Sequence, residues 1–196
     1  MFDLASFIEA AGYAGVTAII FAETGLFFGF FLPGDSLLFT AGILASQGFF
    51  NIWLLSALTT TAAIVGDSVG YWPGAKAGPL IFTRPDSFWF SQERVRVAER
   101  FFGRFGPISI VVARFLPVVR TFVPVIAGVA GMRYRTFFVY NVVGAFLWAF
   151  GIPVLGYYAG NAIPGIERYL IPIVALIVLS SLIPLGYEVL KRRMRG

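Results

Sequence analysis

Long apolar segments with few interruptions dominate the pattern of hydrophobic and polar residues along this chain. Residues 10–31 and residues 52–72 each contain a single charged side chain. Residues 137–160 and residues 169–187 contain none. Because a membrane-spanning helix needs about 20 mostly apolar residues, this pattern predicts several helices that cross a membrane.

Two further apolar segments do not fit this simple picture. Residues 36–48 are too short to cross a bilayer. Cytoplasmic flanks are enriched in Lys and Arg, which places Arg104 and Arg133 on the same side of the membrane. The 28 residues between them are fewer than the roughly 40 that two full crossings need, so they are predicted to form a re-entrant helical hairpin broken near Pro117.

Charged residues are concentrated between residues 75 and 106 and in the terminal sequence KRRMR. Ser91 can cap a helix there, and apolar positions recur on one face of that helix at Val95, Ala98, Phe102 and Phe105. This spacing predicts an amphipathic helix on the cytoplasmic membrane surface. The same charge rule places the C-terminus in the cytoplasm and favours an external N-terminus.

Composition strengthens the membrane assignment and removes several kinds of chemistry. The chain has 196 residues, of which 58% are hydrophobic and 13% are charged, against about 25% charged residues in soluble domains. It contains no cysteine and no histidine, which excludes disulfides, thiolate chemistry and the usual proton shuttle. Proton transfer would therefore depend on carboxylates, and no cofactor or metal site is expected. Because no basic segment precedes the first apolar stretch, we expect no secretory signal.

Glycine and tryptophan positions indicate packing rather than chemistry. Glycine recurs every four residues at positions 66, 70, 74 and 78, a spacing typical of closely packed membrane helices. The four tryptophans are interpreted as interface or packing residues rather than as a ligand cage. They are Trp53, Trp72, Trp89 and Trp148.

Short motifs recur along the chain at a nearly constant spacing. FLP occurs at residues 31–33 and 115–117, AG occurs at 41–42 and 127–128, and GYWPG at 70–74 matches GYYAG at 156–160. The offsets of 84, 86 and 86 residues predict two halves, about 10–74 and about 107–160, each a broken hairpin followed by a spanning helix. Breaks at corresponding positions of two halves are a sequence pointer to a transporter site.

The predicted fold class is therefore an all-α integral membrane protein with a single membrane domain, residues 1–196. It combines an inverted repeat of two re-entrant helical hairpins plus spanning helices with a cytoplasmic amphipathic segment at about 75–106. A C-terminal spanning helix follows at 169–190. With the second hairpin open to the cytoplasm, the first opens outward, and the tips of the two hairpins meet near the bilayer centre.

Five charged residues lie in apolar surroundings, namely Glu23, Asp35, Asp67, Arg114 and Arg120. A charge at mid-helix costs roughly 2.5 to 3.5 kcal/mol to insert, so intramembrane charge favours a functional role. One alternative is that these residues pair with each other and fix the packing. A second alternative places some of them near an interface, and for Asp67 this is as good an interpretation as function.

Helix breaks are predicted at Pro33, Gly34, Pro117 and Pro124. On continuous helices the two arginines would point about 120° apart, and Glu23 would lie about 18 Å from Asp35. Folding the chain back at the breaks lets the members of each pair converge. Half-helix N-termini beside two arginine forks suit a phosphate group, whereas two buried carboxylates suit a proton or a cation.

The chain contains four stretches that resemble the DedA family of bacterial membrane proteins, which shares the VTT, or SNARE-associated, domain with eukaryotic lipid scramblases. They are FAETGLFFGFFLPGDSLLFTAG, GDSVGYWPGAKAG, RFFGRFGPISIVVARFLPVVRTFVPVIAGVAGM and NVVGAFLWA. The resemblance covers roughly residues 10–160. The family's acidic pair falls on Glu23 and Asp35 without a gap, and its arginine pair falls on Arg114 and Arg120.

The resemblance implies facing re-entrant hairpins and lipid transport. Members of this family are linked to the return of undecaprenyl phosphate, the cell-wall lipid carrier, across the cytoplasmic membrane, and to dependence on proton-motive force. On this basis Arg114 and Arg120 would bind the lipid phosphate, and Glu23 and Asp35 would couple protons, with Asp67 in support. The implied protein is a multi-pass flippase of the bacterial cytoplasmic membrane. Its partners would be an anionic lipid, protons and the membrane, with no nucleic acid, and its oligomeric state stays open.

Three other functions stay open from the residues alone. The first is a proton-coupled ion antiporter or a less selective phospholipid scramblase. The second is a lipid-phosphate phosphatase, but the familiar kind uses histidine, and a nucleophile at Asp35 or Ser36 lacks an evident base. The third is a structural or adaptor role, which the expense of intramembrane charge disfavours. We therefore expect a transporter and no enzyme.

Overall fold

The computed structural model describes residues 4–25, 34–81, 100, 102–163, 165–166 and 172. These residues form helices and connecting turns, and no β-strand occurs among them. The helices are α1 (Leu4–Gly25), α2 (Gly34–Ser46), α3 (Ile52–Ile81), α5 (Ile108–Ala113), α6 (Pro117–Val129), α7 (Tyr134–Ala145), the π-helical turn η2 (Phe146–Phe150) and α8 (Gly151–Ala162). The predicted all-α class is confirmed for this part of the chain.

Two stretches of continuous helix are long and apolar enough to cross a membrane. They are Ile52–Lys76, with 25 residues and mean hydropathy 1.4, and Tyr134–Ala162, with 29 residues and mean hydropathy 1.8. They confirm the spans predicted at 52–72 and 137–160. In α3 the exposed tryptophans Trp53 and Trp72 lie about 28 Å apart along the axis, close to the thickness of a bilayer's hydrocarbon core. Aromatic side chains at both edges of a span are typical of membrane proteins.

Helix α3 is longer than its sequence predicts. It continues through Pro73 and Gly74 to Ile81, seven residues into the segment predicted to begin a cytoplasmic amphipathic region. A β-carbon at position 74 would overlap the backbone carbonyl of Val125 in α6, so glycine permits the close helix contact that its spacing predicted. Most of that amphipathic region, the C-terminal span at 169–190 and Pro33 lie outside the described residues.

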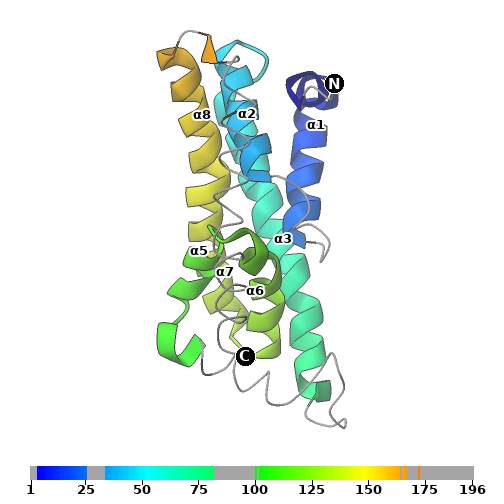
Figure 1. Ribbon diagram of the computed structural model, residues 1–196. Coiled ribbons are helices and arrows are strands. Elements are labelled where there is room, and N and C mark those ends of the chain that lie inside the picture. The colour runs from blue at the N-terminus through cyan, green and yellow to red at the C-terminus, as the bar shows by residue number, and fades with distance from the viewer. Residues whose placement is uncertain are drawn as a thin grey trace, which may run out of the picture.

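Two short helices, α2 and α6, each pack against one of the two long helical stretches, which are α3 and α7–η2–α8 (Figure 1). In the view shown, α2 lies beside α8 in the upper half, and α6 lies beside α3 in the lower half. Glycines allow both approaches. A side chain at Gly42 of α2 would overlap the backbone of Pro153 in α8, and a side chain at Gly128 of α6 would overlap the backbone of α3 at Tyr71.

Two apolar clusters form the core, one in each half of the molecule. The first joins α1, α2, α3 and η2 through residues such as Ile20, Leu38 and Leu55. The second joins α3, α5, α6 and α7 around Tyr71 and Phe137. Figure 1 shows the end of α1 and the starts of α2 and α6 near mid-height, between the two clusters. This arrangement places the charged residues of these helices between two apolar layers.

Candidate functional site: a buried arginine–carboxylate network

Arg120 connects α6 to α1 and α2 at the centre of the molecule. It lies in the first turn of α6, where one guanidinium nitrogen donates to Glu23 of α1 and another donates to Asp35 of α2, at 3.0 Å. Glu23 is fully buried and Arg120 is 7% exposed. Charge-assisted hydrogen bonds of this kind are stronger than neutral ones, so Arg120 fixes three helices to one another.

The first residue of α2 lies against the carboxylate of Glu23 from α1. Gly34 is the first residue of α2, and its N–H donates to Glu23 at 3.3 Å. A side chain at position 34 would overlap the Glu23 carboxylate. A negative charge at a helix N-terminus satisfies unpaired N–H groups and is favoured by the helix dipole. Glycine at position 34 therefore leaves room for the Glu23 carboxylate beside Asp35 and Arg120.

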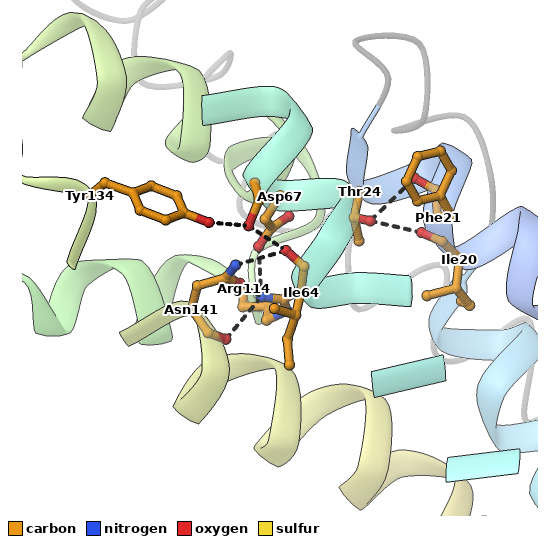
Figure 2. Close-up of polar contacts among 9 residues, drawn as sticks. Ile20, Phe21, Thr24, Ile64, Asp67, Arg114, Tyr134 and Asn141 are labelled. Atoms are coloured by element: carbon orange, nitrogen blue, oxygen red, sulfur yellow. Dashed lines mark hydrogen bonds and ion pairs between the residues drawn. The ribbon is translucent and has the colours of Figure 1, made fainter. Parts of the chain in front are cut away.

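Arg114 makes a separate set of contacts (Figure 2). It lies in the turn between α5 and α6, and its Nη1 donates to Asp67 of α3 and to the Asn141 side chain of α7, both at 2.7 Å. The Asn141 amide in turn donates to the carbonyl oxygen of Ile64 at 3.1 Å. Arg114 and Asp67 are 4% and 6% exposed. The network therefore fixes the α5–α6 turn to the middle of α3 and to α7.

Trp148 of η2 lies between the two arginine groups. Its indole N–H donates to Asp35 at 2.5 Å. The Arg120 guanidinium carbon lies 4.6 Å from the centre of the indole ring, and that of Arg114 lies 5.6 Å from it. A cation over the face of tryptophan is attracted by the electrons of the ring. The same side chain thus contacts a carboxylate through its edge and two cations through its face.

Several guanidinium N–H groups remain without a partner in the described part of the chain. They are on Nε and Nη2 of Arg114 and on Nε of Arg120. Both arginines line a small cavity of about 10 Å³, together with Asp67 and Thr24. A cavity of this size holds about one water molecule. Buried donors without partners are unfavourable, so the cavity favours an oxygen-rich occupant.

The structure places most of the predicted site residues together. Glu23, Asp35 and Arg120 form one group, and Asp67 and Arg114 form the other. The five charges therefore pair with each other, as one alternative from the sequence anticipated. Asp67 is buried and paired with Arg114.

Two of the predicted helix breaks lie at helix starts, and a third lies inside a helix. Gly34 begins α2, and Pro117 occupies the first position of α6 after the extended residue Leu116, where proline is favoured. Pro124 does not break the hairpin, because it lies inside α6, which continues to Val129. Proline removes one N–H and perturbs one turn, and the tight packing of α6 on α3 holds the helix together past that turn.

Sequence reasoning missed two residues of the site. Trp148 was interpreted as an interface or packing residue, and it does pack in the first core cluster, but its contacts with three charged side chains were not expected. Asn141 was not singled out, although it is the one amide within the uncharged stretch 137–160. Its position was a usable signal, because polar side chains inside a span usually bind a partner. The two residues lie seven apart, on one face of the long helix.

Two long apolar helices and a set of charged side chains that pair with one another inside the molecule are features of an integral membrane protein. The VTT domain model matches residues 32–158. The chain belongs to the DedA family.

Relatives with high similarity support this membership. An uncharacterised membrane protein of Mycobacterium leprae (strain TN) is 43% identical over 178 residues, which are 91% of this chain and 79% of that protein. Protein DedA of Escherichia coli (strain K12) is 40% identical over 183 residues, or 92% of this chain and 83% of DedA. Inner membrane protein YghB of the same strain is 34% identical over 165 residues, or 83% and 74%. None of the solved structures matches this chain.

Proposed function

We propose that this protein is a transporter that returns an anionic polyprenyl-phosphate lipid, undecaprenyl phosphate in the first instance, across the bacterial cytoplasmic membrane. The observation that carries the proposal is the set of unpartnered N–H groups on Arg114 and Arg120 beside a small cavity. Guanidinium forks bind phosphate oxygens bidentately. The lipid chain would stay in the bilayer while the headgroup crosses.

The packing of the glycines supports an inverted repeat of two re-entrant hairpins. Gly42 and Gly128 are 86 residues apart, as are Gly74 and Gly160. Gly42 of α2 contacts α8, and Gly128 of α6 contacts α3. Each short helix thus packs on the long helix of the other half. In this scheme the two hairpins enter from opposite sides, the protein is multi-pass and its C-terminus is cytoplasmic.

The ion pairs suggest how transport would alternate. Arg120 holds Glu23 and Asp35 in the arrangement described here, which closes the site. A phosphate that takes the place of these carboxylates on Arg120 would leave Glu23, which is fully buried, and Asp35, which is partly buried, without their cation. Such charges are costly, and protonation neutralises them. Proton uptake by Glu23 and Asp35 would therefore accompany phosphate binding, and no bond of the lipid would be broken.

The first test is binding of phosphate lipid to purified protein. In the Arg114→Ala/Arg120→Ala variant, saturable binding of undecaprenyl phosphate should fall at least about tenfold, because each charged hydrogen bond contributes more than 1 kcal/mol. Phosphatidylglycerol should bind weakly to the wild type. Titration of both lipids by microscale thermophoresis in detergent measures this.

Two further variants make the result specific. Arg104→Ala removes an exposed arginine and should leave binding unchanged. Arg114→Lys/Arg120→Lys keeps both charges and removes only the fork, so it should lose binding even if the alanine variant is unstable. Equal binding of both lipids, or binding that does not need the arginines, would favour the scramblase or ion-antiporter interpretation instead.

A second test concerns proton coupling. Glu23→Gln and Asp35→Asn each remove a proton site while keeping the shape of the side chain. We expect both variants to bind undecaprenyl phosphate, but an imposed pH gradient should no longer stimulate transport into proteoliposomes. Transport without a gradient is the internal control. Variants that still respond to the gradient like the wild type would remove the proposed proton role.

A further inference from the structure

The strongest feature outside the charged residues is the local helix geometry around Trp148. Residues Phe146–Phe150 form a π-helical turn inside the otherwise α-helical stretch from α7 to α8. Such turns are rare and frequently lie at functional sites. This one carries Trp148 at its middle, fully buried.

A contact from α3 supports this turn. The hydroxyl of Thr59 donates to the carbonyl oxygen of Ala149 at 2.9 Å, and Thr59 is fully buried. A π-helical turn changes the backbone hydrogen-bond pattern, and side chains from neighbouring helices commonly satisfy the displaced carbonyl groups. Thr59 therefore holds the turn in place from the opposite long helix, and with it the direction of the indole.

The contacts of Trp148 differ in kind from those of the ion pairs. Its N–H reaches the same Asp35 oxygen that accepts from Arg120. Its ring face attracts the guanidinium groups of both arginines. The indole therefore contacts Asp35 and both arginines through groups that take no part in the Arg120–Asp35 ion pair itself.

We propose that Trp148 is a positioning residue that remains with Asp35 and the arginines while their ion pairs open for the phosphate. The proposal rests on the transport function proposed above. A partly buried carboxylate that loses its donors is disfavoured, and the indole N–H keeps one donor on Asp35. The ring likewise stabilises a guanidinium whose carboxylate has left. Trp148 thereby lowers the free energy of the open site relative to the closed one.

The experiment compares lipid binding and lipid turnover. Trp148→Phe keeps an aromatic face and removes the N–H. The open site then loses its last donor to Asp35, so turnover of undecaprenyl phosphate in proteoliposomes should fall at least about tenfold. The lipid still binds the arginines, so its dissociation constant should change by less than about threefold. Trp148→Leu removes the ring as well and should impair both quantities. Trp53→Phe, at an exposed position, is the matched control.

A second replacement guards against loss of folding in the phenylalanine variant. Benzothienylalanine at position 148 keeps the bicyclic ring and replaces the N–H with sulfur, and it should also slow turnover without weakening binding. Unchanged turnover in both replacements would overturn the positioning role and leave the proposed function intact. Failure of the wild-type protein to bind or move the phosphate lipid would overturn both.

Discussion

Replacement of Arg114 by methionine should destabilise the protein by about 3–5 kcal/mol. The substitution leaves Asp67 as a buried charge without a partner, and breaking one side of a buried ion pair typically has an effect of this size. Arg114 and Asp67 approach to 2.7 Å, and both side chains are less than one tenth exposed. The same change at Arg104, which is exposed, should have little effect. Thermal unfolding in detergent, followed by size-exclusion chromatography, measures the difference.

A double substitution tests whether the Arg114–Asp67 ion pair serves stability alone or lipid binding as well. Arg114→Met/Asp67→Asn removes both charges, so it should be more stable than Arg114→Met alone, because pairs in contact are not additive. Under the proposed function this recovered protein still fails to bind phosphate lipid. Additive losses would contradict the observed ion pair. Recovery of transport together with stability would assign the pair to packing alone.

Replacement of Gly128 by valine should have the second large effect. A β-carbon at this position overlaps the backbone of α3 at Tyr71 and Ala75, and backbone cannot move aside as a flexible side chain can. Helix α6 would have to shift away from α3, and Arg120 would move with it. Overpacking of this kind costs about 1–3 kcal/mol and more where the backbone is involved. We expect a lower unfolding temperature and weaker phosphate-lipid binding.

Gly151 supplies the matched control for this prediction. It lies in a helix, as Gly128 does, but no atom outside its own helix would lie within 4 Å of an added β-carbon. Gly151→Ala should therefore leave stability and binding unchanged or improve stability slightly, because alanine is the better helix former. Similar losses in both variants would show that glycine serves helix flexibility here rather than close approach. A stable Gly128→Val protein would contradict the contact between α6 and α3.

Hydropathy and residue spacing were sufficient to predict the long helices and the close packing of α3. The spans at 52–72 and 137–160 follow from composition alone, because a bilayer sets their length. The glycine spacing also predicted close contact correctly, since Gly66 lies against α1 and Gly74 against α6. Helix length and glycine position depend on nearby residues, so hydropathy and residue spacing are enough to predict them.

The partners of the charged residues could not be predicted in the same way. The sequence suggested that Arg114 and Arg120 converge on one phosphate, but each holds different carboxylates in the structure. Which carboxylate meets which arginine depends on how closely the helices cross. Those distances are set by glycine contacts between segments far apart in the chain, such as Gly42 with Pro153. The contacts of Trp148 depend in addition on a π-helical turn that residue periodicity does not reveal.

The packing of α2 against α8 has a consequence for the order of events during synthesis. Pro153, which covers Gly42, follows it by 111 residues. At about 5–20 residues per second, the ribosome adds that length in roughly 6 to 22 s. During this interval α2 has left the ribosome without the helix that completes its packing. The first half of the protein therefore acquires its final contacts only after most of the second half has been made, and the halves mature together rather than in sequence.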